Sequence, residues 1–184
     1  NAVFGEVKLI QGKIIGQMDA LGFSAKEEAT LTALTLDVVK SSEIEGELLN
    51  YDQVRSSIAR RLGINTAGLV PSSRHIEGVV EMMLDATQRH TLPLTEKRLV
   101  GWHAALFPTG YSGPYKIETG KYRVGKMQVV SGAMGKEKVH YEAVAPKLVK
   151  SEMDKFLDWF NNDKQLDPVL KAAIAHFWFI IIHP

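Results

Sequence analysis

The sequence predicts a mainly α-helical protein with one small β-hairpin, and two observations support this fold class. Apolar residues recur at intervals of three or four positions through most of the chain, which is the spacing of amphipathic helices. Between Gly110 and about Ala143 the pattern changes to short apolar runs separated by glycines, which is typical of strands and turns. The periodic stretches add up to roughly six or seven helices.

Four helices are predicted in the first half of the chain. Gly22 ends the first helix, and Ser24 with Glu27 forms a capping box that opens the second. Gly63 stops the third helix. These helices cover roughly residues 6–22, 24–45, 50–62 and 72–90.

The second half of the chain combines helices with the hairpin. Pro108 ends the first of these helices because proline cannot continue a helix interior. Asp167 and Pro168 provide an N-cap and a first-turn proline for the last one. The expected elements are helices over 92–108, 145–161 and 168–182 and a β-hairpin over 127–141.

The composition is that of an ordinary globular domain. The chain has 184 residues, of which 45% are hydrophobic and 23% charged, enough for one substantial domain or one domain with a small appendage. Lysine and arginine (22) nearly balance aspartate and glutamate (21), so no overall basic field attracts nucleic acid or a membrane. With no cysteine, the chain fits a cytoplasmic location.

The most apolar stretch of the sequence is "FWFIIIHP" at residues 177–184. The helix predicted over 168–182 is too short to cross about 30 Å of hydrocarbon, and Lys171 and His176 interrupt it. We therefore interpret it as a helix buried at the centre of the bundle and expect no membrane partner.

The end of the second helix carries a carboxylate on its predicted core face. The residues at helical spacing are Leu31, Leu34, Val38, Ser41 and Glu45. If Ser41 and Glu45 continue this stripe, the buried carboxylate needs a cationic partner, most naturally an arginine. The alternative is that the helix frays before Gly46 and that Glu45 is solvated.

His183 stands at the end of the apolar last helix, at the mouth of the predicted core. Pro184 forces the chain out of the helix there. An imidazole in this position can act as a general base, and the alternative is a capping or structural histidine. His176 lies seven residues earlier on the same face, but two histidines without a third ligand nearby in sequence make a poor metal site.

The hairpin offers an edge for binding another chain. A strand such as Met127–Val130 can pair with an extended segment through backbone hydrogen bonds. The alternative is a hairpin that only packs on the bundle. The sequence contains no P-loop, GxGxxG, HExxH or GxSxG motif, and nothing in it points to nucleic acid.

These three features, in this order, resemble the Fic (filamentation induced by cAMP) family. The segment "AAIAHFWFIIIHP" is similar to the helix that leads into the family signature HPFx[D/E]GNGRxxR, of which His183 and Pro184 are present. The segment "GKYRVGKMQVVSGAMGKEKVHY" resembles the family's β-hairpin flap. The segment "SSEIEG", from Ser41 to Gly46, matches the inhibitory motif [S/T]xxxE[G/N].

The resemblance implies a Fic-type helical bundle with a β-hairpin flap and an N-terminal helical extension. Residues 1–60 would form the extension with the inhibitory helix, and residues 61–184 the Fic core. The acidic metal ligand and the phosphate-binding GNGR of the signature are absent from the printed sequence, which therefore offers no metal ligand. We expect the natural protein to continue and the printed fragment to be inactive.

The activity implied by the resemblance is protein adenylyl transfer, in which AMP moves from ATP to a hydroxyl side chain of a target protein with Mg2+ as cofactor. The target can be the protein itself, and a homodimer is one candidate assembly of what we expect to be a bacterial, cytoplasmic enzyme. His183 would be the general base. The flap residues that would hold target or nucleotide are Met127, Gln128, Val129, Val130 and Ser131.

The resemblance also implies autoinhibition. Glu45 would pair with an arginine of the missing part of the signature, steadied by Ser41 and followed by Gly46. Two alternatives remain open. One is removal of AMP, or transfer of another phosphate-containing group, on the same scaffold. The other is a helical regulatory or adaptor module without catalytic activity.

Overall fold

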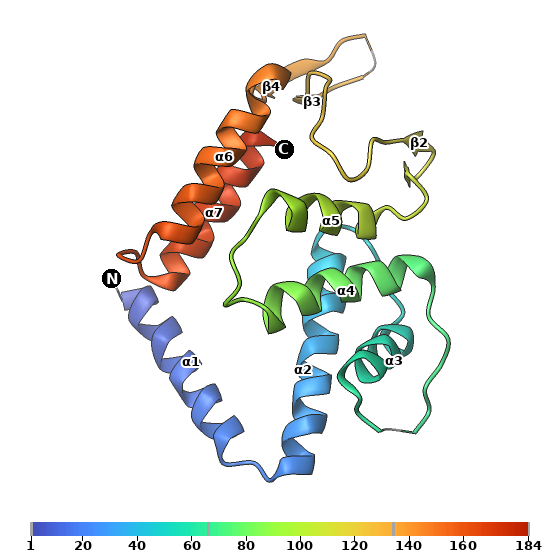
Figure 1. Ribbon diagram of the computed structural model, residues 1–184, viewed down its shortest axis with the longest axis vertical. Helices are drawn as coiled ribbons and strands as arrows, with labels where there is room; N and C mark the ends of the chain where they lie inside the picture. The colour runs from blue at the N-terminus through green and yellow to red at the C-terminus, as the bar shows by residue number, and fades with distance from the viewer. Residues whose placement is uncertain (1, 66, 134, 184) are drawn as a thin grey trace. The chain divides into compact units, whose positions relative to one another are not determined.

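The computed structural model describes residues 2–65, 67–133 and 135–183 and divides into two compact units, Asn1–Leu84 and Asp85–Pro184. The described residues form seven helices and two antiparallel hairpins of two strands each (Figure 1). The predicted mainly α fold with a small β excursion is confirmed. The division of the domains at residue 60 stays a prediction.

The first unit is helical throughout. It contains α1 (Ala2–Asp19), α2 (Phe23–Ile44), α3 (Tyr51–Leu62) and most of α4 (Arg74–Gln88). Its buried residues come from α2, α3 and α4: Leu31, Thr35, Val38, Val54, Ser56, Ser57, Ile58, Ala59, Ile76, Gly78, Val79 and Val80. Helices α2 and α3 pack on each other, whereas α1 contributes no buried residue.

The sequence around α3 explains its boundaries. The Asn50 side chain accepts a hydrogen bond from the Gln53 backbone N–H at 3.0 Å, which satisfies a donor that has no partner inside the helix. Gly63 follows the last turn with φ of 69°, a left-handed conformation that glycine adopts without steric cost. The predicted third helix and its stop are confirmed at these positions.

The buried face of α2 differs from the predicted one. Thr35 is fully buried, and its hydroxyl donates to the Leu31 carbonyl at 2.6 Å, so the polar side chain is satisfied within the helix. The buried positions are 31, 35 and 38, and both Ser41 and Glu45 are exposed. Ser41 and Glu45 therefore do not continue the buried stripe, and the structure shows the alternative, a helix that ends before Gly46 with an exposed Glu45. The core face is rotated, and the helix ends at Ile44, before Glu45.

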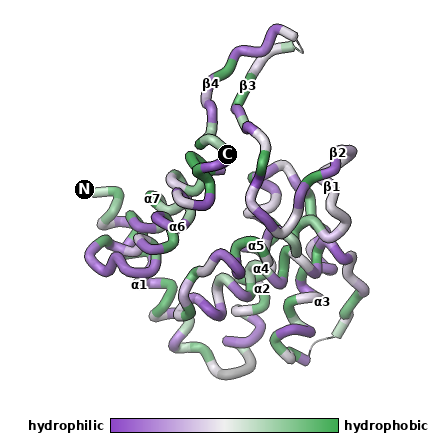
Figure 2. Tube along the Cα trace, turned by 45° about the horizontal axis from the view of Figure 1, so that its top comes forward, coloured by the Kyte–Doolittle hydropathy of each residue, from purple (hydrophilic) through white to green (hydrophobic). Residues whose placement is uncertain are grey.

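The second unit joins three helices to two hairpins. Its helices are α5 (Glu96–Leu106), α6 (Pro146–Asn162) and α7 (Pro168–Ile182). Its strands are β1 (Tyr111–Ser112), β2 (Tyr115–Lys116), β3 (Gln128–Ser131) and β4 (Lys138–Glu142). The β3–β4 hairpin confirms the predicted one, and Figure 2 shows that it projects as an arm carrying hydrophobic and hydrophilic residues.

The hairpin of β1 and β2 was not predicted. Each strand has two residues, Tyr111 pairs with Lys116, and Ser112 pairs with Tyr115. Gly113 makes the turn with a φ of 55°. Strands this short show no alternation of apolar and polar residues, so the pattern that identifies a strand in a sequence is missing.

Helices α6 and α7 pack side by side and hold the core of the second unit (Figure 1). The Asp167 side chain accepts from the Val169 N–H at 2.8 Å, and Pro168 fills the first turn, as predicted. The rings of Phe156 and Trp178 meet edge to face with centroids 5.8 Å apart. The buried residues are Leu94, Val149, Met153, Phe156, Leu157, Ala175 and Ile182.

The prediction that α7 lies at the centre of the bundle is wrong for the described residues. Ala175 and Ile182 are its buried side chains, whereas Phe177 is 67% exposed. The reason is that α6 is the helix of this unit that packs on α7, and one neighbouring helix covers one face. Within the described segments, no helix has the length and apolar character needed to cross a membrane.

Candidate functional site

His183 lies where α7 ends. Its backbone N–H donates to the Phe179 carbonyl at 2.9 Å, and its φ of −145° and ψ of 82° take the chain out of the helix. The side chain of the preceding Ile182 is 1% exposed and belongs to the core of the second unit. The half-buried His183 therefore directly follows a helix whose last residue packs in the core of this unit.

The end of α7 is also held from the β-hairpin. The Tyr141 hydroxyl donates to the Ile181 carbonyl at 2.6 Å. The guanidinium of Arg123 donates to the Ile182 carbonyl at 3.2 Å and also to the carbonyl of Val144, which follows β4. The segment of His183 and the base of the hairpin are thus connected by hydrogen bonds.

Arg123 and Tyr141 were not singled out from the sequence. Their contacts bridge 40 and 59 positions along the chain, and no local spacing reports such distances. One usable signal was present, since Arg123 precedes β3, Tyr141 lies on β4, and the last carbonyls of a helix need donors.

The hairpin has one irregularity in its register. Gln128 pairs with Glu142 and Val129 with Tyr141, but Val130 pairs with Val139, which leaves His140 as the extra residue of a β-bulge. His140 Nε2 lies 2.6 Å from the hydroxyl of Ser131 across the hairpin.

The flap residues expected to bind a target are on the hairpin, at its first strand. Gln128 to Ser131 form β3, and all four are exposed, with Val129 at 45% and Val130 at 47%. Met127 lies just before the strand, and its carbonyl accepts from the Ala143 N–H at 3.0 Å. Within the described residues β3 pairs with β4 alone, so its other edge offers backbone groups to an added strand.

The residues of the expected inhibitory motif lie in the first unit. Glu45 is the C-cap of α2, and Gly46 follows with a φ of 83°, donating its N–H to the Glu43 carbonyl at 3.0 Å. The Ser41 and Glu45 side chains are exposed. His183 belongs to the second unit, and the structure tests no contact of Glu45 with it.

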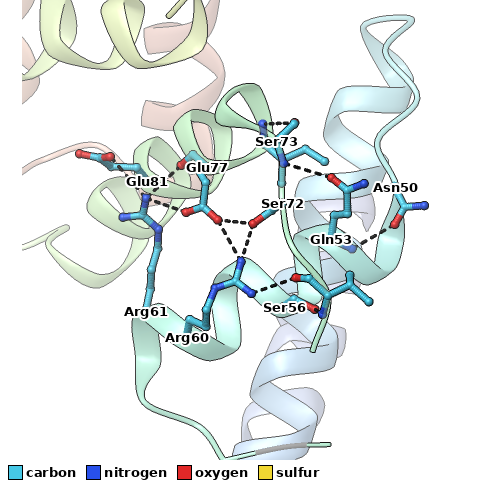
Figure 3. Close-up of polar contacts among 11 residues, drawn as sticks. Asn50, Gln53, Ser56, Arg60, Arg61, Ser72, Ser73, Glu77 and Glu81 are labelled. Atoms are coloured by element: carbon cyan, nitrogen blue, oxygen red, sulfur yellow. Dashed lines mark hydrogen bonds and ion pairs between the residues drawn. The ribbon is translucent and has the colours of Figure 1, made fainter. Parts of the chain in front are cut away.

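A polar cluster in the first unit was also missed from the sequence (Figure 3). The carboxylate of Glu77, on α4, lies 3.1 Å from the Nη2 atom of Arg60 and 3.1 Å from that of Arg61, both at the end of α3. It also accepts a hydrogen bond from the Ser72 hydroxyl. Burial alone would raise the pKa of Glu77. The hydrogen bonds from Ser72 and the two arginines outweigh burial and hold that pKa below its ordinary value.

This cluster is a structural connection rather than a site. The two guanidinium groups already have a carboxylate partner, and Arg61 also lies 3.5 Å from Glu81. The contacts join the end of α3 to α4 in the first unit.

The residues present do not fit a metal ion. In the part of the chain that the structure describes, no three side chains of histidine, cysteine, aspartate or glutamate gather in a metal-binding group. His176 is exposed. We therefore derive no step through Mg2+ from this chain.

The fold and this site define a helical protein in which a β-hairpin braces the end of a helix that carries a histidine. A crystal structure of a Fic family protein from Desulfovibrio desulfuricans G20 has a similar fold, with a TM-score of 0.58 and 25% sequence identity over 97% of this chain and 51% of that one. The chain thus spans about half the length of this solved relative.

The chain belongs to the Fic/DOC family, whose model matches residues 93–184. Residues 1–64 match a domain of unknown function, DUF4172. The protein adenylyltransferase fic-1 of Caenorhabditis briggsae is 33% identical over 70 residues, which are 37% of this chain and 12% of that protein. Its namesake from Caenorhabditis elegans is 35% identical over 46 residues, covering 24% of this chain and 9% of that protein.

Proposed function

We propose that the protein containing this chain is a protein adenylyltransferase that transfers AMP from ATP to a hydroxyl side chain of a target protein. The observation that carries the proposal is His183 at the end of a helix whose last carbonyls are bonded to the base of an open-edged β-hairpin. Family membership and the similarity to proteins named adenylyltransferases support the same reaction.

In the proposed reaction, the neutral imidazole of His183 takes the proton of the target hydroxyl. The hydroxyl oxygen forms a bond to the α-phosphorus of ATP as the bond from that phosphorus to the bridging oxygen breaks, and pyrophosphate leaves.

The hairpin would place the target. A strand of the target pairs with the outer edge of β3, so that its backbone is fixed by hydrogen bonds and its hydroxyl faces the end of α7. Because Val129 and Val130 are exposed, they would supply the apolar contacts to that strand. The target is a protein, with self-modification included.

Substitution of His183 tests the base assignment. With radiolabelled ATP, His183→Ala in the protein that contains this chain is expected to abolish labelling of protein, because no base then accepts the hydroxyl proton. The control is His176→Ala, which removes an exposed histidine of the same helix and should keep parental labelling. Labelling that persists in His183→Ala would remove His183 from the mechanism.

We further propose that Glu45 inhibits the enzyme. The exposed Glu45 carboxylate, just beyond the end of α2, is available to pair with the arginine expected in the family signature. An interaction of about 3 kcal/mol between them would lower activity roughly a hundredfold. Glu45→Gln removes the charge and should raise labelling, whereas Glu43→Gln, whose carboxylate pairs with Lys40 at 2.5 Å, should not. Equal labelling by Glu45→Gln and the parent would refute the inhibitory role.

A further inference from the structure

The C-terminal end of α7 has a hydrogen-bonding problem that the β-hairpin solves. The last carbonyls of any helix lack an intrahelical donor, and when they are buried they need one from elsewhere. At the end of α7 these include the carbonyls of Ile181 and Ile182, and the Ile182 side chain is in the core.

Two side chains from the hairpin region provide the donors. Tyr141 lies on β4, opposite Val129, and its hydroxyl is 2.6 Å from the Ile181 carbonyl oxygen. Arg123 lies in the segment between β2 and β3, and its Nη2 is 3.2 Å from the Ile182 carbonyl oxygen. Each donor therefore serves one of two consecutive carbonyls directly before His183.

Arg123 fixes the segments before and after the hairpin at the same time. Its Nη1 donates to the Gly125 carbonyl at 2.8 Å, ahead of β3, and its Nη2 also donates to the carbonyl of Val144, just beyond β4. One planar guanidinium thus joins the chain entering the hairpin, the chain leaving it and the end of α7. A lysine, whose donors all lie on one nitrogen, cannot reach these three carbonyls with the same geometry.

The charge of Arg123 is also suited to this place. Within the described residues no carboxylate pairs with it, and the acceptors around it are backbone carbonyls. The end of a helix carries the negative pole of the helix dipole, so a cation there is stabilised without an acidic partner. The electrostatics favour the arginine because α7 ends at this point.

We propose that Arg123 and Tyr141 are positioning residues for His183, which hold the last two carbonyls of α7 and thereby fix the histidine relative to strands β3 and β4. The assignment deepens the proposed function, since the histidine it positions is the proposed base. A target strand bound to β3 and the base that deprotonates its hydroxyl are then held at a fixed distance by these hydrogen bonds. We call the contacts of Arg123 and Tyr141 with the end of α7 the frame.

Amide hydrogen exchange tests the frame without relying on catalysis. In Tyr141→Phe and in Arg123→Lys, the His183 N–H, which donates to Phe179, should exchange about tenfold faster than in the parent, because the last turn of α7 opens more easily. The Lys171 N–H, in the first turn of α7, should keep its rate. Matched controls are Tyr115→Phe, at a tyrosine 74% exposed, and Arg89→Lys, at a side chain 70% exposed.

Labelling kinetics test whether the frame matters for the base. The two variants should lower kcat for labelling about tenfold or more, since small displacements of a reacting group cost rate steeply, and the controls should not. Unchanged exchange at His183 would overturn the proposal, whatever the activity. Faster exchange with unchanged kcat would overturn the positioning role. If Glu45→Gln transfers no label, the proposed function fails, while the exchange result still decides whether Arg123 and Tyr141 hold the end of α7.

Discussion

Glu77 is the residue whose charge contributes most clearly to stability in the first unit. Its carboxylate faces Arg60 and Arg61 and accepts from Ser72, so removal of the charge weakens the contacts between α3 and α4. Because the side chain is 34% exposed, water screens part of the effect.

We predict that Glu77→Gln lowers the free energy of unfolding by about 1 kcal/mol. Urea denaturation of parent and variant measures the difference. Glu81→Gln serves as the control, because that side chain is 62% exposed and lies 3.5 Å from Arg61. Equal losses in the two variants would mean that the cluster has no special role.

The same residue predicts a pH dependence. The pKa of Glu77 is lower in the folded protein than its ordinary value of 4.5. Its contribution is therefore present above that value and is lost as the pH falls through the folded pKa. The difference in stability between the parent and Glu77→Gln should shrink as the pH falls below 4.5 and through the folded pKa. A difference that stays constant in acid would contradict the assigned contacts.

At the scale of elements, the turn of the β3–β4 hairpin requires glycine at position 132. Gly132 has a φ of 110°, and a Cβ added there would lie 2.8 Å from the Lys136 carbonyl oxygen. Since both the conformation and the space exclude a side chain, the hairpin needs glycine at this position.

We predict that Gly132→Ala destabilises the hairpin by about 1–3 kcal/mol. Amide exchange on the β4 residues measures this, and the Val139 and Tyr141 amides should exchange faster. Gly101→Ala is the control, because Gly101 lies in α5 with open space around it and alanine favours a helix. Unchanged exchange in Gly132→Ala would mean that the turn tolerates a side chain.

Much of the fold could be predicted from local sequence signals. Asn50 and Gly63 bound α3, and Asp167 with Pro168 opens α7, because caps and turns act within a few residues. The face of α2 was predicted wrongly because Leu34 and Thr35 are neighbours. The sequence gives no sign that Thr35 is the buried one, because its hydroxyl is satisfied within the helix by the Leu31 carbonyl. Tertiary packing, not periodicity, decides which of two adjacent faces is buried.

The candidate site was predictable only in part. The strand of the flap followed from the short apolar run at Val129 and Val130 between glycine-rich turns, and His183 from its place after an apolar helix. The contacts of Arg123 and Tyr141 with α7 could not be predicted, because they join segments that are remote in sequence. The exposure of Phe177 likewise depends on which elements pack on α7.

At the scale of the whole molecule, two compact units divide the expected functions. Glu45 and the helices that support it belong to the first unit, and His183 with the hairpin belongs to the second. Residues 93–184, which match the Fic/DOC family model, lie in the second unit, and the DUF4172 match at 1–64 lies in the first.

The most direct test of the central claim is to compare ATP labelled on the α-phosphate with ATP labelled on the γ-phosphate. Adenylyl transfer predicts that the protein containing this chain, assayed as Glu45→Gln, labels protein from α-labelled ATP and not from γ-labelled ATP, because pyrophosphate leaves with the γ-phosphate. Labelling from the γ-phosphate, or no labelling from either by the folded protein, would contradict the proposed function.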